Sequence, residues 1–272
     1  MAEAVASHYA GSANLADAIA DRLRMAGKDL GSLKAADLAT VDEFHIRGRA
    51  ATLELAQSLG LDASSHLLDI GSGLGGPART VAEAHGCRVT GIDLTQAFCD
   101  AATAMTAWVG LADRVAFRQG DATRLPFDDD IFDAAMTIHV AMNIPAKDRM
   151  YAEARRVLKP GALFAAYDVV QGEGGDVLFP VPWAREPSIS HLATPEEMAA
   201  LLEGVGFDIL ERRDSTEDSQ AWFEAMAGRM QKAPPAVGFQ LFLGEDFPAM
   251  ARNQVANLRD RRIRTVTYLC RA

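Results

Sequence analysis

Cysteine is scarce in this sequence, and its placement excludes two common uses of the residue. The three cysteines are Cys87, Cys99 and Cys270, with no CxxC spacing and no histidine cluster beside them. Disulfide frameworks and zinc sites are typically marked by paired or closely spaced thiols. We therefore expect three small buried thiols in a reducing compartment, and no metal site.

Positive charge is also in short supply. The chain carries 27 Lys and Arg against 37 Asp and Glu, a net charge of −10 at pH 7. Binding to a nucleic-acid backbone draws on a clustered excess of Lys and Arg, so we expect no nucleic-acid partner. No apolar run approaches the roughly 20 residues of a membrane span, and the N-terminus lacks the pattern of a signal peptide. The sequence thus predicts a cytoplasmic protein without a membrane partner.

What the chain does contain is an alternation of strand-like and helix-like segments from residue 66 onward. This alternation predicts an α/β fold in which helices cover both faces of a parallel sheet. The expected strands are residues 66–70, 87–93, 115–121, 132–140, 162–170, 207–214 and 264–272.

Three segments stand outside this alternation: helices before the first strand, a Gly- and Pro-rich loop at 171–193, and an apolar insertion before the last strand. In open parallel sheets, ligands bind at the carboxyl ends of the strands, so these segments are candidate walls of a site. The insertion is too apolar for a linker. Its residues expected to face inward are Trp222, Phe223, Met226 and Met230.

The segment Leu67–Thr80, LLDIGSGLGGPART, holds the most specific local signal. Its glycines follow the G-x-G-x-x-G pattern between a strand and a helix, and Asp93 lies about twenty residues further on, as in NAD-binding turns. Asp69 favours a different ligand, because a pyrophosphate needs neutral or positive surroundings whereas an ammonium and a sulfonium suit a carboxylate. The chain also lacks the Tyr-x-x-x-Lys pair of short-chain dehydrogenases.

Five ordered segments resemble the class I S-adenosylmethionine (SAM) dependent methyltransferases: LLDIGSGLGG, VTGIDLT, QGDATRLPFDDDIFDAAMT, RMYAEARRVLKPGALF and TPEEMAALLEGVGF. The resemblance spans residues 66–213. It implies a doubly wound, Rossmann-like, mostly parallel seven-stranded sheet with an antiparallel C-terminal strand. It also implies a helical cap over the active site at residues 1–60 and a SAM-binding domain at 61–272, with a helical substrate lid at 215–262.

The resemblance also implies which residues hold the cofactor. Asp69, Gly71, Ser72 and Gly73 would line the methionine part of SAM, and Asp93 would hold the ribose hydroxyls. The remaining contacts would be Leu94 and Gln96 near the adenine, Asp121 and Ala122 at its edge, and Ile138 and His139 beneath the cofactor. Asp93 and Asp121 have a simpler interpretation, in which they only cap the turn or helix that follows.

For the methyl acceptor, the segment at 44–61 resembles the small-molecule branch of the family, which methylates substrates such as glycine, phosphoethanolamine, sterols and quinones. Phosphoethanolamine enzymes carry a catalytic histidine where this chain has Asn143. The candidate acceptor residues are His45, His139 and Asn143 first, and Tyr9, Asp168 and Trp183 second. Each could instead have a purely structural role: the histidines and aromatic rings in packing, and Asp168 in a strand-end turn.

The leading hypothesis is a SAM-dependent methyltransferase acting on a small molecule. N-methylation of an amine is slightly favoured over O, S or C, because the glycine and sarcosine enzymes are similar and Asp168 would suit a cationic amine. C-methylation of a prenyl or sterol-like substrate would need an apolar pocket and one positioned base, and a Met- and Phe-lined cavity under the lid would favour it. Two further hypotheses are an NAD-dependent oxidoreductase and a SAM-binding protein without catalysis, while the general base and a homo-oligomeric state stay open.

Overall fold

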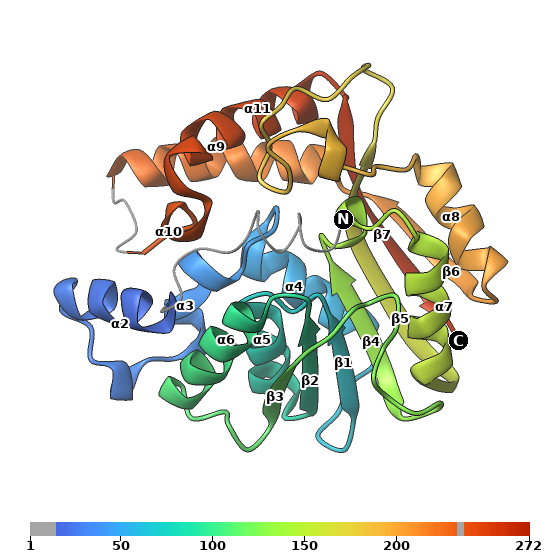
Figure 1. Ribbon diagram of the computed structural model, residues 1–272, viewed down its shortest axis with the longest axis horizontal. Coiled ribbons are helices and arrows are strands. Elements are labelled where there is room, and N and C mark those ends of the chain that lie inside the picture. Colours follow the sequence, from blue (N-terminus) through green and yellow to red (C-terminus); the bar gives the residue numbers. More distant parts are fainter. Residues whose placement is uncertain (1–14, 233–236) are drawn as a thin grey trace.

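The computed structural model describes residues 15–232 and 237–272, and the side chains up to 226 and from 237. A seven-stranded sheet in the order β3-β2-β1-β4-β5-β7-β6 forms its centre (Figure 1). The strands are β1 His66–Ile70, β2 Arg88–Asp93, β3 Val115–Gln119, β4 Phe132–Ile138, β5 Leu158–Gln171, β6 Asp208–Asp214 and β7 Ile263–Arg271. Strand β7 runs antiparallel to β5 and β6, whereas β1 to β5 pair in parallel. The predicted fold class is confirmed.

Helices flank the sheet and gather beyond the strand ends. The α-helices are α2 Leu15–Met25, α3 Ala35–Asp42, α4 Gly48–Ser58, α5 Gly76–His85, α6 Gln96–Trp108, α7 Lys147–Val157, α8 Pro195–Gly204, α9 Thr216–Lys232, α10 Gln240–Leu243 and α11 Phe247–Arg259. Short 3-10 turns lie at Leu30–Ser32, Ala141–Asn143, Pro187–Ile189 and Gly244–Asp246. Within the described ranges, no helix combines the length and hydropathy needed to cross a bilayer.

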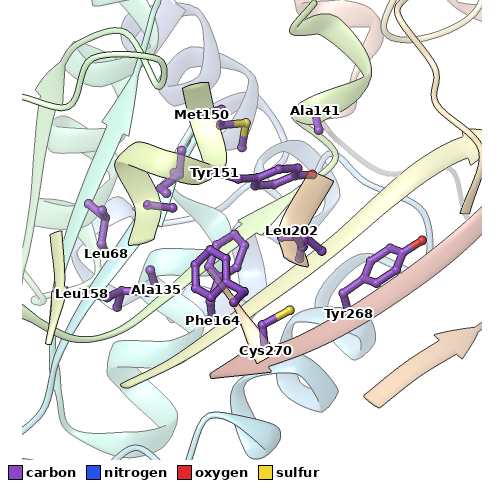
Figure 2. Close-up of a cluster of buried hydrophobic side chains, with 14 of the residues drawn as sticks. Leu68, Ala135, Ala141, Met150, Tyr151, Leu158, Phe164, Leu202, Tyr268 and Cys270 are labelled. Carbon is purple, nitrogen blue, oxygen red and sulfur yellow. The ribbon is translucent and has the colours of Figure 1, made fainter. Parts of the chain in front are cut away.

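The two faces of the sheet carry separate hydrophobic clusters, because neighbouring strand residues point to opposite sides. Leu67 of β1 packs in a cluster with residues of α4 and α5. The next residue, Leu68, belongs to a cluster with residues of α7 and α8. Figure 2 shows this second cluster, in which Phe164 of β5 lies near Leu202 of α8. Since both faces are covered, the strand ends are left for ligand binding.

Strand β5 begins earlier than predicted. Residues 159–161, KPG, were expected to be a turn before the strand, but they belong to it. Phe132 of β4 pairs with Leu158, and the next pair is Ala134 with Leu163, so the extra residues form an irregularity in the ladder. Gly161 has φ +78°, a left-handed backbone conformation that favours glycine.

Two groups of helices meet beyond the strand ends: the N-terminal helices α2 and α3, and the lid helices α9, α10 and α11. Leu38 of α3, from the first group, shares a hydrophobic cluster with Phe242 of α10 and Met250 of α11. Figure 1 shows α9, α10 and α11 on the side toward which the parallel strands point. In sequence, the lid helices come between β6 and β7. These two strands are neighbours in the sheet, where Asp214 pairs with Val266. The division into a cap at 1–60 and a domain at 61–272 stays a prediction.

Candidate cofactor and acceptor site

A cavity of about 380 Å³ lies at the carboxyl ends of β1, β2 and β4. Its floor is the glycine turn and the strand ends, and its far wall comes from Phe44 and the lid helices. A volume of this size falls in the range of small-molecule sites. The cavity therefore joins a sheet-edge half and a lid half, which are built from different parts of the chain.

The backbone of the glycine turn packs closely against its neighbours, because two of its positions leave no room for a side chain. A Cβ atom on Gly71 would lie 2.3 Å from Val140 Cγ2, and one on Gly76 would lie 2.4 Å from the backbone oxygen of Asp42. At Gly73 a Cβ would meet nothing within 4 Å. The N–H of Gly71 donates to Ile92 O at 2.8 Å, which fixes the turn against β2. The backbone of Gly71, Ser72 and Gly73 thus lies in the cavity wall.

Asp93 at the end of β2 ties this turn to the next one. Its Oδ2 accepts the N–H of Gly73 at 2.9 Å and its Oδ1 accepts the N–H of Thr95 at 2.9 Å. Burial raises the pKa of Asp93, and these two N–H groups oppose that rise. Asp93 therefore accepts hydrogen bonds from both turns and also lines the cavity.

Four other residues predicted near the nucleoside differ in placement. Leu94 lines the cavity, whereas Gln96 does not: it is exposed on α6, where its Nε2 donates to Asp100 Oδ1 at 2.7 Å. Asp121 and Ala122 both line the cavity. Asp121 Oδ1 also accepts the N–H of Thr123 at 2.8 Å, so this residue stabilises its own turn as well as lining the wall.

Asp69 is buried near the end of β1 and is not among the residues that line the cavity, so its contact with the methionine part of SAM stays a prediction. Burial raises its pKa to about 8, and the nearby carboxylates of Glu43 and Asp93 add to the shift while Arg79 opposes it. Its Oδ2 is buried and has no hydrogen-bond partner in the structure.

Unpaired buried polar atoms gather around this end of the cavity. Besides Asp69 Oδ2, they are Asp42 Oδ1, Ser72 Oγ and His139 Nε2, whose residues line the cavity, and Nε of the neighbouring Arg79, which does not line it. Buried polar atoms in proteins almost always have a partner. Such a group of atoms around a cavity is therefore typical of a polar ligand site.

His139 follows β4 and is the most unusual of the predicted acceptor residues. Its φ is +54°, which is uncommon for a residue other than glycine. Burial holds its pKa well below the ordinary value, with a smaller contribution from His45. The ring centroids of His139 and Tyr167 are 4.9 Å apart. His139 is thus a neutral imidazole at neutral pH, with its Nε2 unpaired at the cavity wall. Ile138 before it also lines the cavity.

His45 lines the cavity but uses its ring locally. Its Nε2 lies 2.9 Å from Gly48 O and 3.2 Å from Thr52 Oγ1, which holds the start of α4. Burial lowers the pKa of His45 to about 4. His45 therefore stabilises the N-terminal segment and forms part of the wall at the same time.

The remaining acceptor candidates are mostly held by backbone groups. Asn143 Nδ2 donates to Trp183 O at 2.8 Å and to Ile189 O at 2.9 Å, and both Asn143 and Trp183 line the cavity. Asp168 does not line it: its Oδ2 accepts the N–H of Ala141 at 2.7 Å. The expectation that Asp168 faces the acceptor is corrected, because the carboxylate is turned to the chain after β4. Tyr9 lies outside the described residues.

The lid half of the cavity is aromatic. The ring centroid of Phe44 lies 4.8 Å from that of Phe239 and 5.1 Å from that of Phe242. The apolar residues of this half are Phe44, Met142, Trp222, Phe223, Met226, Phe239, Phe242 and Phe247. The sequence predicted Trp222, Phe223 and Met226, and the side chain of Met230 lies outside the described residues. Phe44, Phe239, Phe242 and Phe247 were missed, although the closely spaced rings of FQLFLGEDF were a visible signal.

Neither metal ligands nor disulfides mark this site. Among residues 15–232 and 237–272, no group of His, Cys, Asp and Glu side chains has the arrangement of a metal site. The three cysteines are free and buried.

Comparisons with known proteins place this architecture in a class. A model described as a methyltransferase domain matches residues 68–166. The methyltransferase GfsG of Streptomyces halstedii is 31% identical over 208 residues, which cover 74% of each chain. A sterol 24-C-methyltransferase of Neurospora crassa is 29% identical over 187 residues, which cover 65% of this chain and 49% of the relative. The chain spans about half or less of the length of the sterol methyltransferases it matches.

A solved structure adds a useful contrast. The [4+2]-cyclase SpnF is 28% identical, with a TM-score of 0.65 and coverage of 82% of this chain and 80% of that chain. The fold and the site thus define a class I methyltransferase scaffold, and that scaffold also occurs in a protein named as a cyclase. The chain itself belongs to the class I SAM-dependent methyltransferase family, as the five motifs predicted. SAM is the cofactor of this family, so the NAD hypothesis for the glycine turn is not supported.

The unpaired atoms fit SAM in chemical type. Its ammonium needs acceptors, which the carboxylate of Asp42 at the cavity wall offers, and its carboxylate needs donors such as the hydroxyl of Ser72. Asp93 presents a carboxylate to the cavity, which suits the vicinal hydroxyls of a ribose.

Proposed function

We propose that the protein transfers a methyl group from SAM to a carbon atom of a mostly apolar small molecule. The observation that carries this proposal is the single cavity, which joins a polar sheet edge to an aromatic lid half. The first half suits a charged nucleoside and the second an apolar acceptor. The name of the sterol 24-C-methyltransferase relative supports the same type of acceptor.

The residues in the wall suggest how SAM would be held. Gly71, Ser72 and Gly73 would contact the methionine part, and Asp93 would accept hydrogen bonds from the ribose hydroxyls. The residues around the adenine would be Leu94, Asp121 and Ala122, with Ile138 beneath. Gln96 has no part in this arrangement, because it faces solvent.

The acceptor half supports carbon methylation more than amine methylation. The amine hypothesis drew on the similarity to the glycine and sarcosine enzymes and was compatible with Asp168. The carboxylate of Asp168 accepts backbone N–H groups, and the residue is not among those that line the cavity. Aromatic faces such as those of Phe44 and Phe239 stabilise a cation without offering a carboxylate. A carbon atom that accepts a methyl group through a double bond leaves such a cation on its neighbour before a proton is lost.

The chain has a group that suits this proton loss. When bound, SAM supplies a methyl group activated by a positive sulfur. The alkene π electrons would form the new carbon–carbon bond as the sulfur–methyl bond breaks and S-adenosylhomocysteine leaves, and the resulting carbocation would pass a neighbouring proton to a base. We assign this role to His139 Nε2, which is neutral and unpaired at the wall. A carbocation is so acidic that a weakly basic imidazole is sufficient. Asn143, Trp183 and His45 would shape the pocket around it.

The test is an acceptor screen with purified protein and trideuteromethyl SAM, read by S-adenosylhomocysteine formation and product mass. Sterols with a side-chain double bond and linear isoprenoid alkenes form one group, and sarcosine and phosphoethanolamine form the other. We expect labelled carbon-methylated product only in the first group. Turnover of amines alone would contradict the proposed acceptor. Conversion of an apolar substrate without S-adenosylhomocysteine would point to other chemistry on this scaffold.

We also propose that the protein works in the cytoplasm, which its three free buried cysteines support because such thiols persist in a reducing compartment. Fractionation of the native cells, followed by immunoblotting, tests this location. The expected homo-oligomer stays a prediction, which light scattering on the purified protein would check.

A further inference from the structure

Asp42, the last residue of α3, lies outside the five motifs and reaches the glycine turn. It is 3% exposed and lines the cavity. Its Oδ1 would lie 2.8 Å from a Cβ atom placed on Gly76, so the carboxylate sits directly against the start of α5. The N-terminal part of the chain thus brings an acidic group to the methionine end of the site.

One oxygen of this carboxylate is used and the other is not. Arg79 donates to Asp42 Oδ2 at 2.7 Å, and both side chains are 0% exposed. The remaining bonds of the Arg79 guanidinium go to Leu74 O, Ala102 O and Thr106 Oγ1. Asp42 Oδ1 is buried without any hydrogen-bond partner in the structure.

More buried carboxyl groups lie here than this arginine can pair with. Asp42 and Asp69 are both buried, and the buried Glu43 acts on each of them. Glu43 itself accepts hydrogen bonds from the hydroxyls of Thr52 and Thr80. An uncompensated buried carboxylate is costly, so this arrangement favours a ligand that brings a cation.

We propose that Asp42 Oδ1 accepts a hydrogen bond from the ammonium group of SAM and thereby acts as a binding residue supplied by the N-terminal segment. The Ser72 hydroxyl, also unpaired, remains as a donor for the SAM carboxylate. This inference rests on the proposed function, since it assigns a contact to the same cofactor.

The ionisation of Asp42 predicts a pH dependence of cofactor binding. Burial raises the pKa of Asp42 to about 6 and that of Asp69 to about 8. A bound ammonium favours the ionised carboxylate of Asp42, so SAM affinity should fall as the pH falls through about 6. The charged groups that also act on this pair are Glu43, Arg49, Arg79 and Asp93.

Calorimetric titration of the full chain with three ligands separates the contact from other effects. They are S-adenosylhomocysteine, its decarboxylated analogue, which keeps the ammonium, and 5′-methylthioadenosine, which lacks the whole amino-acid part. Asp42→Asn should weaken the first two by at least about tenfold, the value of a charge-assisted hydrogen bond, and leave the third within about twofold. Asp100→Asn, which removes an exposed carboxylate of α6, is the matched control and should change none of them.

Because Asp42→Asn also weakens the pair with Arg79, its folding is checked by thermal unfolding, and the wild type gives an independent reading. Between pH 7.5 and 5, wild-type affinity for S-adenosylhomocysteine should fall about tenfold more than that for 5′-methylthioadenosine. If a folded Asp42→Asn binds S-adenosylhomocysteine as the wild type does, or if both ligands share one pH profile, the role of Asp42 is overturned. If the wild type binds neither SAM nor S-adenosylhomocysteine, the proposed function fails with it.

Discussion

The two halves of the cavity are built in different ways. The sheet-edge half is fixed by hydrogen bonds that backbone N–H groups donate, such as those from Gly71 to the carbonyl of Ile92 and from Gly73 to the side chain of Asp93. The lid half is held by side chains from distant segments, such as Phe44 against Phe239 and Phe242. A wall made of backbone tolerates few changes, whereas a wall of packed rings can be altered one side chain at a time. Changes in the first half should therefore affect cofactor binding or folding, and changes in the second should affect acceptor selection.

The largest effect is expected at the point where the two halves meet. His139→Asn keeps a residue that tolerates the positive φ of this position but removes the basic imidazole. Loss of a general base typically lowers the rate about 10²- to 10⁴-fold, so kcat on an accepted alkene should fall by that factor. Initial rates of S-adenosylhomocysteine formation measure it. A kcat within about threefold of wild type would rule out the base role.

The next effect concerns the sheet-edge half alone. Asp93→Asn keeps the size of the side chain but replaces a carboxylate that holds the N–H groups of Gly73 and Thr95. We expect SAM affinity to fall about 10- to 100-fold, because hydrogen bonds to a charged group contribute about 1.5–3 kcal/mol each. Calorimetry measures the affinity, with Asp100→Asn as control. Unchanged affinity would show that Asp93 only caps the turn.

A pair of glycine variants separates folding from binding within the same turn. Gly71→Ala places a Cβ 2.3 Å from Val140 and should destabilise the protein by about 2–4 kcal/mol. Gly73→Ala meets open space, so it should cost only about 1–2 kcal/mol for its positive φ, while its methyl group obstructs SAM. Urea unfolding and SAM titration of both variants measure the two effects. Equal stability losses would contradict the distinction.

The smallest effect is expected in the lid half. Phe239→Leu removes a ring that lies 4.8 Å from Phe44 and lines the cavity. Since an aromatic pair contributes about 0.5–1.5 kcal/mol, KM for an apolar acceptor should rise about 2- to 12-fold. SAM affinity should stay as in the wild type. If SAM affinity falls while KM for the acceptor does not, the two halves do not divide the ligands as proposed.

The same contrast explains how far the sequence reached. The glycine turn, Asp93 and the mostly parallel sheet with its antiparallel last strand follow from local patterns and from the family resemblance. Local patterns place a residue near the strand ends, but they do not show toward which side it points. The sequence therefore could not show that Gln96 faces solvent or that Asp168 accepts backbone N–H groups. Asp69 is buried near the end of β1 and is not among the residues that line the cavity.

Most of the lid half and the burial of Asp42 could not be predicted from the sequence. Phe44 and Phe239 are separated by almost the whole fold in sequence, and only the tertiary packing brings their rings together. The pairing of Asp42 with Arg79 crosses 37 positions. A lone acidic residue at the end of a short helix has an ordinary explanation as a surface residue. Its burial without full pairing becomes visible only in the folded chain.

The antiparallel pairing of β6 with β7 has a consequence for how this scaffold can change. Because Asp214 and Val266 are neighbours in the sheet, the intervening helices leave and re-enter it at one place. An insertion whose two ends are neighbours in a sheet can be lengthened at small entropic cost, since the entropy lost on loop closure grows only slowly with length. The sheet would keep its register, and the sheet-edge half of the cavity its shape, if the whole insertion were exchanged for another. The position between these two strands is thus a natural graft point for changing acceptor specificity.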